Sequence, residues 1–208
     1  PGSKAHGGAI GQNFLALALA TLVGVLAPSI AVADFAAGMA AARQGDFVTA
    51  LVEWEPLAAT GDMDAQMNLG MMYERGAGVD QDPAMALVLF TAAATQGHSL
   101  AAYKVGLAFQ LGLGTPVDYG AAVTWFRVSA ENGYPGGVYE LGYAYYQGEG
   151  VDADPEEALK WFYMADELGW PNARPAKNFT ERLLDQGAIE AARLDATTWL
   201  DAHQGLFP

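Results

Sequence analysis

The chain contains an internal repeat of 36 residues, and this repeat limits the possible folds more than any other feature of the sequence. Three successive units, residues 65–100, 101–136 and 137–172, align without insertions or deletions and carry the same residue at seven positions. Self-similarity at a fixed period of this length indicates a repeat array, in which each unit buries its apolar face against its neighbours. The shared positions of the first unit are Gly70, Gly76, Gly78, Asp82, Ala86, Phe90 and Gly97.

Each unit is predicted to form two helices. In the first unit, the first helix covers residues 65–75 and ends at Gly76, because a glycine just past a helix supplies the left-handed residue that closes it. The second helix begins at Asp82, since an aspartate cap followed by proline is a strong start signal, and it ends at Gly97. Gly70 and its equivalents fall inside first helices, where glycine costs about 1 kcal/mol relative to alanine. We therefore expect the partner helix to approach most closely at these glycines.

The two ends of the array are predicted to be capping elements, because a terminal unit has one side facing water and must be atypical. Residues 34–64 hold a helix pair that lacks the Gly-x-Gly loop of the repeats, and residues 173–208 hold a closing pair. In that closing pair, Trp199 and Leu200 are expected to cover the last open face. The predicted helices are 36–43 and 47–59 at the N-terminal end, and 175–186 and 188–203 at the C-terminal end.

The units follow the pattern A-x-x-x-L-G-x-x-Y-x-x-G-x-G-V-x-x-D-x-x-x-A-x-x-W-x-x-x-A-x-x-x-G, which resembles the Sel-one-like repeat (SLR), a relative of the tetratricopeptide repeat. The second unit departs from this pattern at Phe109 and at Thr115-Pro116. The resemblance implies an all-α fold, a right-handed α-solenoid of antiparallel helix pairs whose first helices line a concave face. Besides the shared positions, the matching residues are Ala65, Leu69, Tyr73 and Val79 in the first unit, and Leu141, Tyr145, Val151 and Trp161 in the third.

The resemblance also implies a binding role. Family members are mostly adaptor or scaffold proteins, many of them exported by bacteria, and the motif residues are structural. We therefore expect a scaffold that binds a protein or peptide partner on its concave face at the bacterial envelope, with no catalytic residue, no metal and no cofactor. Two alternatives stay open: a β-lactam-binding hydrolase of the kind described among cysteine-rich secreted members, and a structural subunit of a motility or secretion complex.

Residue types and charge narrow these alternatives. The chain has no cysteine, which excludes a disulfide scaffold, a thiolate zinc site and a cysteine nucleophile. It also has no Ser-x-x-Lys, Gly-x-Ser-x-Gly or His-Glu-x-x-His motif, so no nucleophile–base pair can be assigned. A formal net charge of −14 repels phosphate backbones, and nucleic-acid binding is not expected. Asp80 and Asp82, like Asp152 and Asp154, recur in loops, but helix capping explains the second of each pair better than a calcium loop does.

The first 33 residues have the features of a secretory signal peptide. They carry one charge, Lys4, then an apolar run from Phe14 to Leu26, and they end in Ala31-Val32-Ala33, which fits a cleavage site. We therefore expect a periplasmic or secreted protein. The alternative is an uncleaved membrane anchor, because the apolar character extends from Phe14 to Ala33, about the length that spans a bilayer.

Binding residues are expected where the repeat motif does not dictate the side chain. The third, seventh and tenth positions of each first helix share one face, and two methionines and four tyrosines occur there. Such side chains give an adaptable, amphipathic surface for a peptide or a helix, and the fourth positions are expected to rim it. The candidate partner-binding residues are Met67, Met71, Tyr103, Leu107, Tyr139, Tyr143 and Tyr146, with Asn68, Lys104 and Glu140 at the rim.

The alternative is that these side chains pack against the neighbouring unit, because buried aromatic residues usually belong to a core. A binding surface requires Tyr143 and Tyr146 to be accessible to solvent. His98 is predicted to pack between units, since Tyr134 and Trp170 occupy the same position in the sister units.

Overall fold

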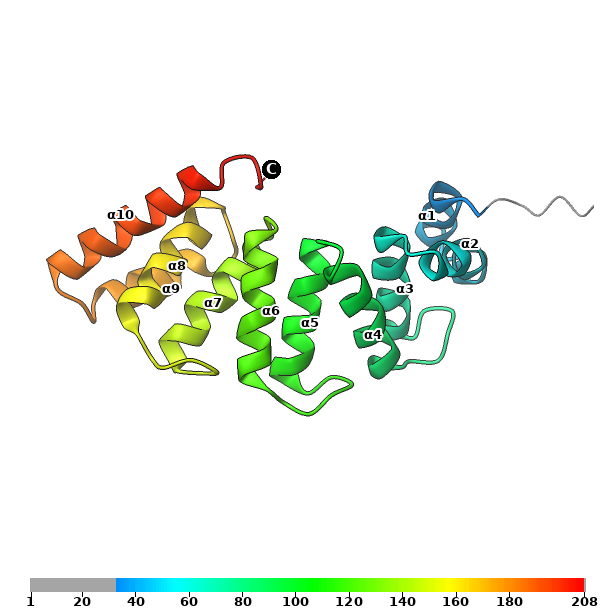
Figure 1. Cartoon of the computed structure of the whole chain (residues 1–208), viewed down its shortest axis with the longest axis horizontal. Coiled ribbons are helices and arrows are strands. Elements are labelled where there is room, and N and C mark those ends of the chain that lie inside the picture. Colours follow the sequence, from blue (N-terminus) through cyan, green and yellow to red (C-terminus); the bar gives the residue numbers. More distant parts are fainter. Residues whose placement is uncertain (1–32, 208) are drawn as a thin grey trace, which may run out of the picture. The chain divides into compact units, whose positions relative to one another are not determined.

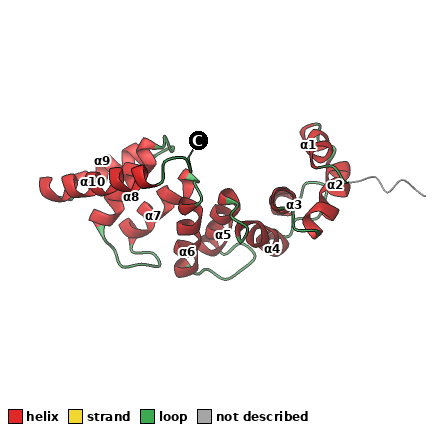
Figure 2. Ribbon diagram, turned by 45° about the horizontal axis from the view of Figure 1, so that its top comes forward, coloured by secondary structure: helices red, strands yellow, loops and turns green. Residues whose placement is uncertain are grey.

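The computed structural model describes residues 33–207, and within this range it contains ten α-helices and no strand. The helices are α1 (Phe35–Arg43), α2 (Phe47–Ala59), α3 (Met63–Arg75), α4 (Pro83–Ala94), α5 (Ser99–Leu111), α6 (Tyr119–Glu131), α7 (Pro135–Gln147), α8 (Pro155–Glu167), α9 (Ala173–Glu181) and α10 (Gln186–Ala202). From α1 to α9 each helix packs on the next one, and α10 packs on α8 (Figure 1, Figure 2). This arrangement confirms the predicted all-α solenoid of helix pairs.

The predicted signal peptide, residues 1–33, lies outside the described part of the chain except for Ala33. Between residues 33 and 207, no helix combines the length and the apolar character that a membrane crossing requires.

The glycines inside the first helices mark the closest approach of each helix pair, as predicted. A Cβ atom placed on Gly70 would lie 2.5 Å from the ring of Phe90, and one on Gly106 would lie 2.5 Å from the ring of Phe126. The third unit repeats the contact between Gly142 and Phe162, at 2.7 Å. The phenylalanine of each second helix therefore rests directly on the backbone of the first helix.

The N-terminal helix pair has the same contact with a shorter loop. A Cβ atom on Gly38 would lie 2.4 Å from Nε1 of Trp54, so Gly38 corresponds to Gly70 and Trp54 to Phe90. The loop between α1 and α2 covers residues 44–46, whereas the loop between α3 and α4 covers residues 76–82, which is four residues longer. A comparison at a fixed spacing of 36 residues therefore aligns Trp54 with the repeats but misaligns Gly38.

Aspartate caps open the second helices, as predicted. Oδ1 of Asp82 accepts a hydrogen bond from the backbone N–H of Met85, and Asp118 and Asp154 do the same at the starts of α6 and α8. The glycine after each first helix has a positive φ, which is 69° at Gly76, and it ends the helix as expected.

The second glycine of each Gly-x-Gly loop serves a different purpose, which is contact between units. A Cβ atom on Gly114 would lie 2.4 Å from the carbonyl oxygen of Pro83, and one on Gly150 would lie 2.2 Å from that of Tyr119. Pro83 and Tyr119 begin the second helix of the preceding unit. The loop of each unit can therefore approach the preceding helix pair only because no side chain stands in between.

The C-terminal helices differ in their bounds from the prediction. One helix was expected over residues 175–186, but α9 begins at Ala173 and already ends at Glu181. The reason is that Asp185 caps the next helix, with its Oδ1 accepting from the N–H of Ala188 at 3.0 Å. On α10, Trp199 lies 5.7 Å from Trp161 between ring centroids and covers the core of the third unit.

Candidate functional site

The predicted partner-binding residues of the first helices divide into side chains that pack inside the array and side chains that reach its surface. Met67, at the third position of its repeat, is 2% exposed and belongs to the core, so it is not available to a partner. Tyr103, the equivalent residue of the second unit, is partly buried, and its ring centroid lies 5.0 Å from that of Tyr134. Tyr139 packs on Phe162 at 5.7 Å. The third positions therefore contribute mainly to packing between helices.

The seventh positions, Met71, Leu107 and Tyr143, line three hollows between consecutive helix pairs. The first junction hollow lies where α3 meets the α1–α2 pair, the second where α5 meets the α3–α4 pair, and the third where α7 meets the α5–α6 pair. Their volumes are about 310, 260 and 370 Å³, in that order. Each hollow therefore lies between the first helix of one unit and the helix pair of the unit before it.

The three junction hollows are the same site repeated along the chain. In the first hollow the lining residues that recur are Phe47, Trp54, Asn68, Met71, Met72, Arg75 and Ala77. Their counterparts 36 residues later line the second hollow, as Pro83, Phe90, Lys104, Leu107, Ala108, Leu111 and Leu113. The third hollow repeats five positions of the second, as Gln110, Tyr119, Glu140, Tyr143 and Glu149. The repeat fixes the position of the site, and the residues between the motif positions change its chemistry.

The first junction hollow is apolar with two cationic side chains in its lining. Phe47, Trp54 and Met71 supply the apolar surface, and Arg43 and Arg75 contribute guanidinium groups. Neither arginine forms an ion pair with any residue between 33 and 207. This hollow can therefore offer two charged hydrogen-bond donors beside an apolar surface.

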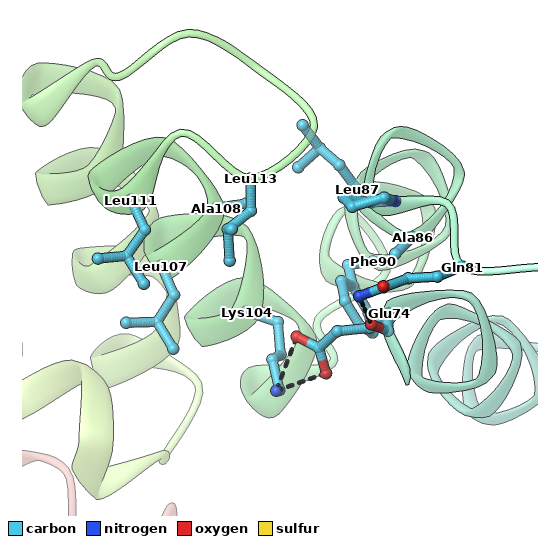
Figure 3. Close-up of a pocket in the computed structure, with 11 residues that line it drawn as sticks. Glu74, Gln81, Ala86, Leu87, Phe90, Lys104, Leu107, Ala108, Leu111 and Leu113 are labelled. Carbon is cyan, nitrogen blue, oxygen red and sulfur yellow. Dashed lines mark hydrogen bonds and ion pairs between the residues drawn. The ribbon is translucent and has the colours of Figure 1, made fainter. Parts of the chain in front are cut away.

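The second junction hollow is lined by aliphatic side chains beside an internal ion pair (Figure 3). Leu107 and Leu111 project from α5, with Leu87 on α4 across from them. Nζ of Lys104 lies 2.9 Å from Oε2 of Glu74, so these two charges satisfy each other. What remains for a ligand is an apolar surface that fits an aliphatic side chain.

The third junction hollow is acidic and aromatic. Glu140 and Glu149 line it together with Tyr139 and Tyr143, and no lysine or arginine is part of the lining. Burial raises the pKa of Glu140 to about 7; the nearby Glu149 raises it as well, while a hydrogen bond with the Gln110 side chain lowers it. A cation placed here would lie beside the carboxyl groups of Glu140 and Glu149 and beside tyrosine side chains, and it would favour the ionised form of Glu140.

Tyr143 and Tyr146, which must be accessible if the first helices form a binding surface, are both partly exposed. The Tyr143 hydroxyl accepts a hydrogen bond from Nε2 of Gln147 at 3.0 Å and lines the third junction hollow. Tyr146 does not line this hollow; it packs edge-on against Phe179 of α9, with 6.0 Å between the ring centroids. Tyr143 therefore belongs to the candidate surface, and Tyr146 joins the third unit to the C-terminal cap.

The rim residues Asn68, Lys104 and Glu140 line the first, second and third hollows respectively. Sequence reasoning did not select Arg43 or Arg75. Arg75 is one position beyond the tenth, which is the last position of the predicted binding face. Arg43 corresponds to Arg75 only when the four-residue difference in loop length is taken into account. An alignment of the first helices alone, without their loops, places Arg43 and Arg75 at the same position and would have identified them as a pair.

His98 has a capping role that the sequence did not predict. Its Nδ1 accepts a hydrogen bond from the N–H of Ala101 at 3.2 Å and so caps α5, while its Nε2 lies 3.5 Å from Asp64. Its sister residues Tyr134 and Trp170 do pack between units, with their ring centroids 5.7 Å apart. Nowhere in the described chain do three His, Asp or Glu side chains gather as a set of metal ligands.

Comparisons with known proteins agree on one kind of repeat. Residues 64–98, 99–134 and 135–169, which make up about half of the chain, match the family model of the Sel1 repeat. These bounds differ by one to three residues from the units read from the sequence. No curated protein matches the chain.

Two solved structures are similar to the chain in fold. The Sel1 repeat protein from Oxalobacter formigenes has a TM-score of 0.67 and 24% sequence identity, over 83% of this chain and 72% of its own. A protective antigen present in uropathogenic Escherichia coli strains, which displays an SLR fold, has a TM-score of 0.58 and 24% identity, over 81% of this chain and 45% of its own.

Proposed function

Because this chain belongs to the Sel1 repeat family, whose helical-repeat fold is a general scaffold for protein interactions, we propose that it binds a segment of a partner protein along its three junction hollows. The observation that carries this proposal is the recurrence of one lined hollow at three successive unit junctions. Repeat arrays bind extended partners in this way, because each unit contributes one subsite to a continuous surface.

The chemistry of the hollows supports binding rather than catalysis. Their linings combine methionine, leucine and tyrosine side chains with a few charged groups, which is the composition of an adaptable peptide-binding surface. The residues shared by the repeats are used for helix packing and capping, as at Gly70 and Asp82. The net charge of −14 favours a protein partner over a nucleic acid.

The place of action in this proposal is the bacterial envelope. Lys4, the apolar run from Phe14 to Leu26 and the sequence Ala31-Val32-Ala33 support export through a signal peptide. The absence of cysteine is compatible with a periplasmic location, where disulfides are permitted but not required.

Affinity capture from envelope extracts tests the proposal. The full chain would be compared with Leu107→Asp, which places a charge in the apolar second junction hollow. Val88→Asp is the matched control, because Val88 is a 63% exposed residue of α4 that lines none of the three hollows. All three chains should show the same helicity and melting temperature.

The expected result is one protein that is retained by the original chain and by Val88→Asp and is lost from Leu107→Asp. Retention of the same protein by all three chains would contradict a binding site in the hollows. Loss from both variants would indicate a general effect of added negative charge and would equally contradict it.

A further inference from the structure

We propose that the three junction hollows together recognise one extended partner segment of mixed charge. The first hollow takes a carboxylate, the second an aliphatic side chain, and the third the side chain of a lysine or arginine. This assignment rests on the function proposed above and deepens it by naming the chemistry of the partner.

The assignment of a carboxylate to the first hollow rests on Arg43 and Arg75. These residues occupy equivalent places on α1 and α3, line one hollow, and are not ion-paired within the described chain, although acidic residues outnumber basic ones by 24 to 10 overall. Their position in the last turn of each helix favours a cation, but the sister residues Leu111 and Gln147 show that the turn does not require one. A pair of guanidinium groups beside an apolar surface is suited to binding a carboxylate.

The aliphatic subsite follows from the second hollow. Its two charges, on Lys104 and Glu74, already form an ion pair, so neither calls for a charged ligand group. The remaining lining is dominated by Leu107, Leu111 and Leu113. Burial of an aliphatic side chain against these leucines is favourable at roughly 25 cal/mol per Å² of apolar area removed from water.

The assignment of a lysine or arginine side chain to the third hollow rests on the charge of its lining, which is negative. Glu140 occupies the position of Lys104, and Glu149 occupies the position of Leu113. Neither carboxylate is ion-paired within residues 33–207. Carboxylates beside aromatic side chains, here those of Tyr119 and Tyr143, provide what an ammonium or guanidinium group binds.

The order of the hollows sets the order of the partner's side chains. The ion pair between Glu74 on α3 and Lys104 on α5 joins two successive first helices, and Leu111 lines both the second and the third hollow. The aliphatic residue of the partner should therefore lie between its acidic residue and its basic residue.

Selection from a random dodecapeptide library displayed on phage tests this pattern with the full chain as bait. Three variants are selected in parallel: the double variant Arg43→Ala/Arg75→Ala, the double variant Glu140→Gln/Glu149→Gln, and Arg182→Ala. Arg182 is the control, because it is an exposed arginine after α9 that lines none of the junction hollows.

The original chain and the Arg182→Ala control should both enrich peptides in which an aliphatic residue lies between an acidic and a basic residue. The arginine double variant should lose the preference for the acidic residue only, and the glutamate double variant the preference for the basic residue only. On the original chain, changing the acidic residue of a selected peptide to its amide should weaken binding about fivefold, and on the arginine double variant it should change nothing.

Three outcomes would overturn the assignment: no enriched peptide, enriched peptides without the charge pattern, or an acidic preference that survives the loss of both arginines. The amide substitution is made in the peptide, so it remains decisive even if a protein variant is poorly folded. If a captured protein depends on Leu107 but tolerates Arg43→Ala/Arg75→Ala, the charge assignment fails while the proposed function stands.

Discussion

Lys104 on α5 binds Glu74 on α3, with Nζ 2.9 Å from Oε2, and the same two positions one unit later are Glu140 and Gln110. A carboxylate thus replaces the ammonium group, and an amide replaces the carboxylate. The ion pair of the second junction hollow becomes a partly buried acid in the third, and burial raises the pKa of that acid to about 7. One geometric relationship therefore gives two hollows of different charge.

Stability should depend on pH through Glu140. Its folded-state pKa of about 7 lies above the unfolded value of 4.5, so the folded state binds the proton more tightly. The contribution to the free energy of unfolding is fully present below pH 4.5 and is lost as the pH rises through about 7. Thermal unfolding of the original chain and of Glu140→Gln should show this decline in the first and not in the second. Glu156→Gln, which changes an exposed carboxylate at the start of α8, is the control and should retain the decline.

Replacing Gln110 by lysine should remove the loss of stability that accompanies ionisation of Glu140. Gln110→Lys places a cation beside Glu140 and recreates, with the signs exchanged, the pair formed by Glu74 and Lys104. The pKa of Glu140 should fall, and the stability above neutral pH should rise by about 1 kcal/mol relative to the original chain. Chemical denaturation at mildly alkaline pH measures this gain, and an unchanged pH profile would show that the two side chains do not interact.

The ion pair between Glu74 and Lys104 should stabilise the array modestly. Its side chains are 28% and 21% exposed, so the coupling energy should be about 0.5 to 1 kcal/mol and should shrink at high salt. A double-mutant cycle with Glu74→Gln, Lys104→Met and the combined variant measures it by urea denaturation. Strictly additive effects of the two single changes would mean that the pair contributes nothing.

Gly106→Ala should destabilise the protein, because its methyl group would lie 2.5 Å from the Phe126 ring. Overpacking of this kind costs about 1–3 kcal/mol, and the additional change Phe126→Leu should recover part of the loss by removing the ring. The control is Gly120→Ala in α6, where only Oδ1 of Asp118 lies nearby, at 3.4 Å, and where alanine should be neutral or stabilising. Melting temperatures that fall equally for both single variants would contradict the close contact.

Gly150→Ala should lower the free energy of unfolding by more than backbone strain alone would. The residue has φ +78°, and a Cβ atom would lie 2.2 Å from the carbonyl oxygen of Tyr119 in the preceding unit. Gly169 has a similar φ of +73° with nothing within 4 Å, so Gly169→Ala reports the strain by itself, about 1–2 kcal/mol. The difference between the two variants in urea denaturation is the energy of the contact between units, and equal losses would show that the loop does not press on its neighbour.

Much of the fold was predictable because the repeat and the local signals agree. Asp82 and its equivalents open helices through hydrogen bonds to residues two or three positions away, and Gly76 and its equivalents end helices through their own backbone conformation. These interactions are local, so a single unit of sequence contains them. The spacing of 36 residues then implies that the same pair is stacked again.

Other features depend on contacts that a fixed spacing does not reveal. Gly38 corresponds to Gly70 only because both meet an aromatic ring of the partner helix, and a loop four residues shorter conceals this in the sequence. The end of α9 at Glu181 follows from the cap that Asp185 provides to α10, a competition between two helices that the apolar pattern of either one does not show.

The sequence by itself determined the repeat, the helix pairs and the face that varies between units, because these depend on hydrogen bonds and packing within one unit. Only the tertiary structure decided that Met67 is buried while Met71 reaches a hollow, and that Arg43 and Arg75 share the same hollow. The physical reason is that a hollow forms between units. Its lining comes from residues about 30 positions apart in the chain, and which of them are covered depends on how closely one helix pair settles on the next.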